Sequence, residues 1–410
     1  MSFLEYAVWG SYLTSLGVFL ASIGLGGRIG WFFAAQGAIS LFMPALVGSV
    51  ADRWIQPQRL LGACHVISAL FMTVLGITAL GGCHDFLPLF VLYCLGIGFF
   101  MPTISLSKSV IFTLLARNGM DSVEYFPPIR TWGTVGFVFS MWIVNFLGIK
   151  TSGFQFIQTA VMSLLLCGWT FVLPECPVVR ERAVSLSRKL GFGAFSLLRR
   201  KEMATYFLFS TLISVCLQVK NAYDSPYMES FRTIPEFADS VLIKNSMLLL
   251  SVAQIAEACC FLLVPFFMKR YGIKRVVLIA VAAWCLRFTF LGLGDPGAHW
   301  WLLGLSMLVY GIAFDFFNVA GSIFVEKNTD ASSKAGAQGL LMMFNNGLGT
   351  ILGMTTLQAV LNRFTQSVNV DGVFYKTGNW TGFWITCAIY ALTIGVLFAI
   401  FFRYKDKKTE

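Results

Sequence analysis

One acidic residue lies deep inside a long apolar segment of the sequence. Asp315 is near the middle of the apolar run 300–325, which at about 1.5 Å of rise per residue is long enough to cross a lipid bilayer as a helix. A bare carboxylate at the centre of a membrane helix costs about 2.5–3.5 kcal/mol on insertion scales. Because this penalty favours the neutral acid, Asp315 is a candidate for binding and releasing protons. The alternative interpretation is a structural carboxylate that a neighbouring cation or amide satisfies.

Further polar residues recur at helical spacing in two other apolar segments. Gln218 and Asn221 are three residues apart, as are Gln254 and Glu257, so each pair lies on one face of a helix. Amides inside a helix bundle often only join neighbouring helices. Two amide pairs together with two acids at membrane depth predict a water-filled cavity or a polar ligand. Each amide offers an acceptor beside two donors, a pattern that matches a nucleobase edge and the hydroxyls of a ribose.

A basic residue and an aromatic residue share one face of another apolar segment. Arg130, Thr134 and Phe137 are spaced at i, i+4 and i+7, and the preceding residues Pro127 and Pro128 suit the start of a helix. Arg130 has two interpretations, since its guanidinium could reach the cytoplasmic surface or belong to a polar site. Phe137 and Phe314 offer apolar faces on which a base could stack.

The composition identifies the elements that must position these residues. Of the 410 residues, 57% are hydrophobic and only 12% are charged, whereas soluble domains carry about 25% charged residues. The chain is therefore predicted to be an all-α membrane protein with twelve transmembrane helices in two six-helix halves. The halves span residues 1–174 and 203–410, and a basic cytoplasmic linker, 175–202, connects them as either a surface helix or a solvated segment. The twelve predicted helices are 4–23, 30–50, 60–80, 86–115, 127–148, 154–173, 203–224, 246–268, 275–293, 300–325, 337–360 and 380–402.

The distribution of basic residues predicts the orientation in the membrane. Placing both termini in the cytoplasm puts 20 of the 30 Lys and Arg residues in cytoplasmic loops and six in the opposite loops. Cytoplasmic loops are rich in Lys and Arg, so the bias favours this topology. It also argues against nucleic acid as the partner that a net charge of +10 would otherwise suggest.

One cytoplasmic segment resembles a motif of a large transporter superfamily. Gly48, Asp52 and Arg53 belong to Gly-Ser-Val-Ala-Asp-Arg, which is similar to the G-x-x-x-D-R loop of the major facilitator superfamily. Such a gating loop could hold ion pairs between helices that form and break as the two halves move. A turn with ordinary cytoplasmic positive charge is the alternative.

Three longer segments resemble one family within that superfamily, the bacterial nucleoside:proton symporters. They are Phe-Pro-Pro-Ile-Arg-Thr-Trp-Gly-Thr at 126–134, Phe-Asp-Phe-Phe-Asn at 314–318 and Gly-Ser-Ile-Phe-Val-Glu-Lys at 321–327. The resemblance implies a central nucleoside site to which the first half contributes Arg130, Thr134 and Phe137. It implies that the second half contributes Gln218, Asn221, Gln254, Glu257, Phe314 and Asp315. Lys220 departs from the family pattern.

These observations predict a secondary transporter that imports nucleosides with protons by alternating access, with Asp315 or Glu257 as the coupling acid. We expect a multi-pass protein of the bacterial inner membrane that acts as a monomer in the lipid bilayer. We expect no enzyme activity, cofactor or metal, because the sequence lacks a nucleophile elbow, a phosphate-binding glycine loop and a histidine–carboxylate metal motif. The alternatives are proton-coupled sugar uptake and export of lipophilic cations.

Overall fold

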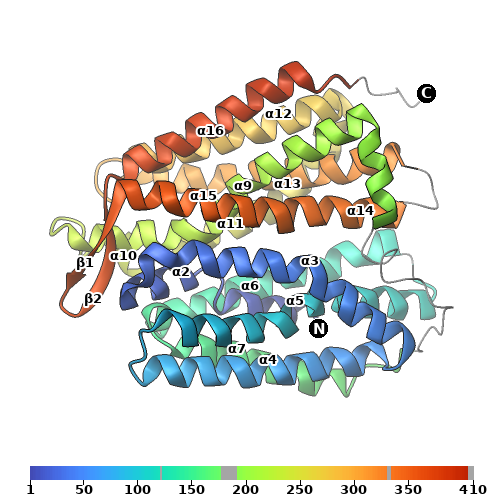
Figure 1. The fold of residues 1–410 in the computed structure, drawn as a ribbon, viewed down its shortest axis with the longest axis horizontal. Helices are drawn as coiled ribbons and strands as arrows, with labels where there is room; N and C mark the ends of the chain where they lie inside the picture. The colour runs from blue at the N-terminus through green and yellow to red at the C-terminus, as the bar shows by residue number, and fades with distance from the viewer. Residues whose placement is uncertain (121, 177–191, 330–333, 405–410) are drawn as a thin grey trace. The chain divides into compact units, whose positions relative to one another are not determined.

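Helices dominate the structure, a computed structural model that describes residues 1–120, 122–176, 192–329 and 334–404 (Figure 1). The chain divides into two units, each described here by itself. Unit 1 contains residues 1–189 and 369–375, and unit 2 contains residues 190–368 and 376–410. All predicted substrate residues of the first half belong to unit 1, and all those of the second half belong to unit 2.

Unit 1 begins with a helix that changes its winding before a sharp break. The segment consists of α1 (Ser2–Gly10), α2 (Leu16–Leu20), the π-helix η1 (Ala21–Leu25) and the 3-10 helix η2 (Gly26–Arg28). Gly24 has φ +85°, a left-handed conformation that glycine adopts without steric cost, so the chain turns there. The remaining helices are α3 (Ile29–Arg53), α4 (Pro57–Leu80), α5 (Phe86–Arg117), α6 (Ser122–Phe146), η3 (Ile149–Thr151) and α7 (Phe154–Thr170).

Unit 2 is also helical and contains a second glycine break. Its elements before the break are η4 (Phe192–Arg199), α9 (Lys201–Ser230), η5 (Phe231–Thr233), α10 (Val241–Lys244) and α11 (Ser246–Phe261). Helix α12 (Val264–Leu293) is interrupted at Gly272, which has φ +75°. The break separates two predicted segments, 246–268 and 275–293. The chain continues through α13 (Trp300–Lys327), α14 (Lys334–Met342), the π-helix η7 (Met343–Leu348), α15 (Gly349–Phe364), β1 (Thr365–Val370), β2 (Val373–Gly378) and α16 (Trp380–Phe401).

The apolar faces of several helices point outward, as expected of a protein in lipid. On α4, Leu70 and Ile77 are each 60% exposed, and on α16, Ile389 is 59% exposed. Soluble monomers rarely expose contiguous apolar surfaces of this kind. Among the described residues, eight helical segments are long and apolar enough to cross a membrane, and α7 and α11 are shorter apolar helices. Helical elements lie within all twelve predicted ranges, and the count of twelve crossings stays a prediction.

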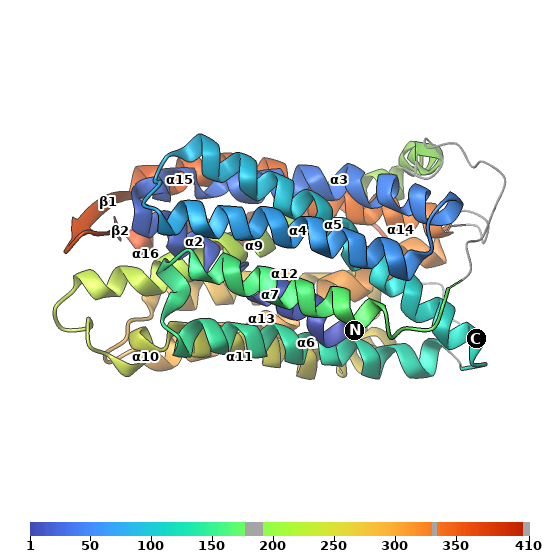
Figure 2. The ribbon, with the colours of Figure 1, turned by 90° about the horizontal axis from the view of Figure 1, so that it is seen from below.

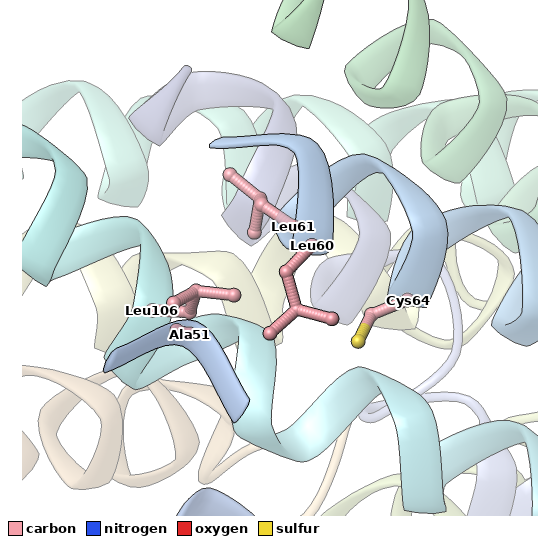
Figure 3. Packing of buried hydrophobic residues seen from close by; sticks show 5 residues of the cluster. All are labelled: Ala51, Leu60, Leu61, Cys64 and Leu106. Atoms are coloured by element: carbon pink, nitrogen blue, oxygen red, sulfur yellow. The ribbon is translucent and has the colours of Figure 1, made fainter. Parts of the chain in front are cut away.

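Within each unit, helices distant in sequence pack side by side. In unit 1, α4 packs against α5 and α7 (Figure 2). A buried cluster of Ala51, Leu60, Leu61, Cys64 and Leu106 joins α3, α4 and α5 near the end of α3 (Figure 3). In unit 2, α12 packs against α13 and α16.

Three expectations about elements are wrong or only partly testable, and one element was not predicted. Helix α6 begins at Ser122 rather than at Pro127, so both prolines lie inside the helix. The segment 365–378 forms a β-hairpin that was not predicted. The predicted loop motif of Gly48, Asp52 and Arg53 is helical, because α3 continues to Arg53, and the side chains of Asp52 and Arg53 lie outside the described residues. In the linker, 177–191 lies outside the described residues, and 192–199 forms the short 3-10 helix η4.

Candidate functional site

In unit 2, the predicted site residues lie on three helices. Helix α9 carries Gln218 and Asn221, and α11 carries Gln254 and Glu257. Helix α13 carries Phe314 and Asp315. Helices α11 and α13 approach closely at Gly311, one turn before Asp315. A Cβ atom on Gly311 would lie only 2.5 Å from the carbonyl oxygen of Ala256. The missing side chain at 311 therefore allows the helix that carries Glu257 to pack against the helix that carries Asp315.

A chain of polar contacts joins α9 to α11. With the Gln254 amide oriented to satisfy both neighbours, its nitrogen donates to Glu257 Oε2 at 3.0 Å. Its oxygen then accepts from Lys220 Nζ at 2.8 Å. Lys220 is only 6% exposed, and a buried ammonium requires an opposite charge or several acceptors. Gln254 thus links the buried cation to the carboxylate of Glu257.

Tyr310 lies at the centre of the charged groups in unit 2. Its ring centroid is 4.7 Å from Lys220 Nζ and 5.2 Å from Arg287 Cζ, distances at which a cation is attracted to an aromatic face. The same ring stacks on Phe314, with centroids 5.6 Å apart and an interplanar angle of 17°. Sequence reasoning missed Tyr310, although it precedes Phe314 by one helical turn.

The predicted coupling acid is buried in this region. Asp315 is 5% exposed on α13, and it interacts electrostatically with Tyr310 and Cys260. Glu257 also interacts electrostatically with Tyr310. The described structure therefore brings both predicted acids of unit 2 near one tyrosine ring.

A buried ion pair joins α9 to α12. Asp224 is near the C-terminal end of α9, yet it is only 2% exposed. Asp224 Oδ2 pairs with the guanidinium of Arg287, which is fully buried on α12 and also donates to the carbonyl of Ser306 at 2.8 Å. The sequence does not identify these two residues as partners.

In unit 1, Arg130 lies over an aromatic ring. Its Cζ atom is 4.1 Å from the ring centroid of Tyr6 on α1. Glycines on α6 allow this contact, because a Cβ atom on Gly133 would lie 2.6 Å from the Tyr6 ring. A Cβ atom on Gly136 would collide with the carbonyl oxygen of Phe3. The close packing of α1 against α6 thus positions Tyr6 below the guanidinium.

The remaining predicted residues of unit 1 follow Arg130 along α6. Phe137 is 6% exposed, and its ring meets that of Trp9 edge to face at 6.4 Å. Thr134, one turn after Arg130, is half-buried. Arg130 is also half-buried. Sequence reasoning missed Tyr6 and Trp9, since two aromatic residues in an apolar helix give no signal by themselves.

Comparison with known proteins gives matches along nearly the whole chain. The model of a family described as nucleoside H+ symporter matches residues 1–407. The xanthosine permease of Escherichia coli (strain K12) is 41% identical over 409 residues, which cover 98% of this chain and 94% of the permease. The nucleoside permease NupG of the same organism is 38% identical over 411 residues, which cover 99% of this chain and 95% of NupG.

Solved structures agree with these matches. The crystal structure of the nucleoside transporter NupG superimposes with a TM-score of 0.87 at 37% identity, over 98% of each chain. The inward-open xylose transporter XylE from Escherichia coli superimposes with a TM-score of 0.62 at 14% identity, over 99% of this chain and 96% of XylE. The second likeness concerns the fold alone. Together they confirm the prediction of an all-α membrane protein with the major facilitator fold.

Proposed function

Because this chain belongs to the nucleoside H+ symporter family, we propose that it imports nucleosides together with protons by alternating access. The observation that carries the proposal is the family match over residues 1–407. The protein is a membrane transporter and not an enzyme, as its relatives are permeases.

The residues of unit 2 suit a neutral, hydrogen-bonding solute. Gln218, Asn221 and Gln254 offer donors and acceptors to a base edge or to ribose hydroxyls. The stacked pair of Phe314 and Tyr310 offers a flat apolar surface beside them, which suits a base. We assign these residues to nucleoside binding.

The residues of unit 1 complete the proposed set. Arg130 supplies up to five donors in a planar fork, and the Tyr6 ring restricts the position of that fork. Thr134 supplies a hydroxyl on the same side of α6, and Phe137 supplies a second aromatic group. We propose that these three residues also contact the nucleoside.

We propose different roles for Glu257 and Asp315. Glu257 accepts from Gln254, which in turn accepts from Lys220, and this arrangement stabilises the ionised carboxylate. An ionised Glu257 can accept hydrogen bonds from ribose hydroxyls. Asp315 is more deeply buried and is therefore the proposed coupling acid, which binds a proton from the outer side and releases it inside.

The remaining parts of the proposal concern the whole transporter. We propose that it resides in the bacterial inner membrane with both termini in the cytoplasm, and that it acts as a monomer. We also propose that Gly48, Asp52 and Arg53, at the cytoplasmic end of α3, contribute to gating.

The test is uptake of radiolabelled uridine and adenosine into proteoliposomes under an imposed proton gradient. We expect accumulation that a protonophore abolishes. Asp315→Asn is expected to abolish accumulation while counterflow of labelled nucleoside continues, because counterflow needs no net proton movement. Glu257→Gln is expected to weaken binding and thereby reduce both activities.

Competition identifies the solute class. An excess of unlabelled nucleoside is expected to block uptake, whereas a hexose and a lipophilic cation are expected to leave it unchanged. Blockage by the hexose or the cation alone would assign the protein to a different solute.

Undiminished uphill uptake by Asp315→Asn would show that this acid does not couple transport.

A further inference from the structure

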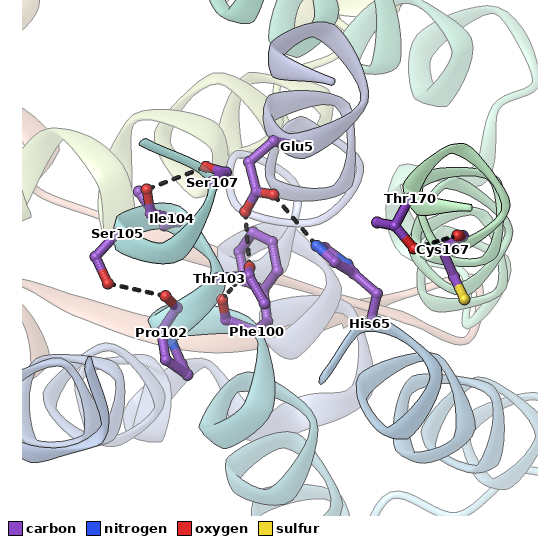
Figure 4. Close-up of polar contacts among 10 residues, drawn as sticks. All are labelled: Glu5, His65, Phe100, Pro102, Thr103, Ile104, Ser105, Ser107, Cys167 and Thr170. Carbon is purple, nitrogen blue, oxygen red and sulfur yellow. Dashed lines mark hydrogen bonds and ion pairs between the residues drawn. The ribbon is translucent and has the colours of Figure 1, made fainter. Parts of the chain in front are cut away.

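A buried acid in unit 1 lies far in sequence from the acids discussed so far. Glu5 on α1 is 1% exposed, and Figure 4 shows its carboxylate directed between His65 on α4 and Thr103 on α5. Glu5 Oε2 is 3.2 Å from His65 Nε2, and Glu5 Oε1 is 2.7 Å from Thr103 Oγ1. His65 and Thr103 are fully buried. A carboxylate so placed within apolar helices requires a specific reason.

The hydroxyl of Thr103 lies near two acceptor oxygen atoms but has only one hydrogen to donate. Its Oγ1 atom is 2.7 Å from Glu5 Oε1 and 2.5 Å from the carbonyl oxygen of Phe100. When Glu5 is ionised, the hydroxyl donates to the carboxylate. When Glu5 is protonated, the acid donates to Thr103 Oγ1, and the hydroxyl then donates to Phe100. Rotation of one hydroxyl group therefore satisfies both protonation states without moving any heavy atom.

His65 tolerates the same change. A neutral imidazole protonated at Nε2 donates to Glu5 Oε2, and this oxygen accepts whether or not the other oxygen carries a proton. His65 Nδ1 is buried without a hydrogen-bond partner among the described residues. With the imidazole neutral, the contact between His65 and Glu5 is kept in both states of the carboxyl group.

We propose that Glu5, with Thr103 and His65, forms a second proton-binding site, carried by the N-terminal unit and separate from Asp315 and Glu257. The proton-binding site does not depend on the proposed function. One consequence does rest on it: proton movement during transport involves an acid in each unit. The proton-binding step itself is simple: a proton from water adds to Glu5 Oε1, and the hydrogen of Thr103 turns towards Phe100.

The charges around Glu5 connect the site with Arg130. Tyr6 follows Glu5 directly on α1, and its ring contacts Arg130. Lys108 on α5 interacts electrostatically with both Glu5 and Arg130. On α7, the neutral Gln158 donates to Ser11, which directly follows α1, and the neutral Gln155 accepts from Ser15, which precedes α2. Among the described residues, the amino group of Met1 and the thiol of Cys64 also interact electrostatically with Glu5.

Protonation of Glu5 would remove a negative charge that attracts Lys108. The repulsion between Lys108 and Arg130 would then be less compensated. Any group that binds Arg130, such as an acceptor on a substrate, would respond to this change. The geometry thus links proton binding at Glu5 with the residue that we assign to nucleoside contact.

Infrared difference spectroscopy tests the site directly, using the full chain in lipid vesicles and no substrate. The carbonyl stretch of a neutral carboxylic acid is distinct from the bands of carboxylates and amides. The measurement compares spectra between about pH 5 and about pH 9, the range in which buried Glu and His residues titrate. An Asp315→Asn/Glu257→Gln variant serves as the background, because it removes the two acids of unit 2 that we propose to act in transport.

We expect a carboxylic acid band that titrates in this background and that Glu5→Gln abolishes. On acidification, the background variant that also carries Glu5→Gln should take up one proton fewer per protein than the background variant alone. A band that Glu5→Gln leaves unchanged would overturn the proposal. A Glu5 band that persists at every pH, or that is absent at every pH, would also overturn it.

A matched pair of variants at Thr103 tests the role of the hydroxyl while retaining Glu5. Thr103→Ser keeps the rotating hydroxyl and is expected to preserve the titration midpoint of the band. Thr103→Val has a similar shape without a hydroxyl and is expected to shift the midpoint by more than Thr103→Ser. Equal midpoints in the two variants would contradict the proposed mechanism. If nucleoside uptake fails but the Glu5 band titrates, the proton site stands and the proposed substrate does not.

Discussion

At the scale of single residues, the contact between Arg130 and Tyr6 explains how a cation can lie within a membrane helix. The guanidinium lies 4.1 Å from the ring centroid, and Arg stacks well on aromatic faces because it is planar and weakly hydrated. The sequence alone left two interpretations of Arg130 open, and its role in a polar site stays a prediction.

Substitution of Tyr6 tests this interpretation. Tyr6→Leu removes the ring and is expected to weaken uridine binding about fivefold, equivalent to about 1 kcal/mol for a cation–π contact. Tyr6→Phe keeps the ring and is expected to bind more tightly than Tyr6→Leu. Isothermal titration calorimetry of the purified protein measures both. Equal affinity of the two variants would show that the ring does not position Arg130.

The buried pair of Asp224 and Arg287 has a different role, because both charges already satisfy each other. Removal of one partner leaves an uncompensated buried charge, which typically destabilises a protein by about 3–5 kcal/mol. Arg287→Met is therefore expected to lower the thermal unfolding temperature strongly. The double variant Asp224→Leu/Arg287→Met is expected to recover most of the loss, as measured by thermal unfolding in detergent. A double variant less stable than Arg287→Met would indicate that the pair does more than neutralise itself.

At the scale of elements, glycines decide which helices can approach closely. Gly133 and Gly136 on α6 face Tyr6 and Phe3 on α1, and neither position has room for a Cβ atom. Small residues allow close packing of helices in membranes, where no hydrophobic driving force acts between helices. The α1–α6 contact is therefore sensitive to a single methyl group.

Gly136→Ala tests this packing. It places a methyl group against the carbonyl oxygen of Phe3, and overpacking of this kind usually costs about 1–3 kcal/mol. Gly98→Ala on α5 is the control, because no atom lies within 4 Å of its Cβ position. We expect a lower unfolding temperature for Gly136→Ala and little change for Gly98→Ala. A similar effect of both variants would point to helix propensity instead of packing.

The turn that precedes α13 contains an acid outside the membrane-spanning segments. Burial raises the pKa of Asp295, but hydrogen bonds from the His299 side chain and from the backbone amides of His299 and Gly297 outweigh burial and lower it. Its Oδ1 atom accepts from Gly297 N at 2.7 Å, and its Oδ2 atom lies 2.6 Å from His299 Nδ1. A lowered pKa in the folded state means that the ionised acid stabilises folding.

The pH dependence follows from that sign. The stabilisation by Asp295 is complete above the pKa of the unfolded state, about 3.9, and is lost as the pH falls through the lower folded-state pKa. At pH 7, Asp295→Asn is expected to be less stable than the natural protein by about 0.5–1 kcal/mol. The difference is expected to shrink as the pH falls below about 3.9. Thermal unfolding of both proteins across this range measures it, and a constant difference would exclude ionisation as the cause.

At the scale of the whole molecule, the distribution of charge predicts the topology. Basic residues are concentrated in one set of loops, and the cytoplasmic side of a membrane protein carries the excess of Lys and Arg. A fluorescent protein fused after residue 404 should therefore mature in the cytoplasm, and alkaline phosphatase fused there should stay inactive. Alkaline phosphatase fused in the turn at Asp371 and Gly372 should be active. The opposite pattern would reverse the predicted orientation.

Some features of the structure could have been found in the sequence. The hairpin β1–β2 turns at Asp371 and Gly372, which have φ +52° and +82°. Asp-Gly is a strong signal for a two-residue hairpin turn, and apolar residues flank it on both sides. The segment between the last two predicted helices therefore contains a hairpin that Asp-Gly signals. The break at Gly272 likewise follows from a glycine between two apolar segments.

Other features depended on contacts that no local pattern reveals. Glu5 and His65 are sixty residues apart, and only the packing of the helices brings them together, although an acid in the apolar segment 4–23 is itself a signal of a polar site. Lys220 departs from the family pattern, and its link with Gln254 and Glu257 depends on how α9 packs against α11. Asp224 lies near the end of its helix, and its buried pairing with Arg287 on another helix cannot be read from either segment.

The sequence by itself determined the class of protein, the helical segments and the membrane-depth polar residues, because burial in lipid imposes a strong rule on every stretch of about twenty residues. Tertiary structure decided which polar groups meet, because pairing depends on helix packing and on the few glycines that allow close approach. That is why Asp315 and Glu257 could be predicted as site residues from their own segments. The contacts of Glu5, Tyr6 and Tyr310 emerged only once the helices around them were in place.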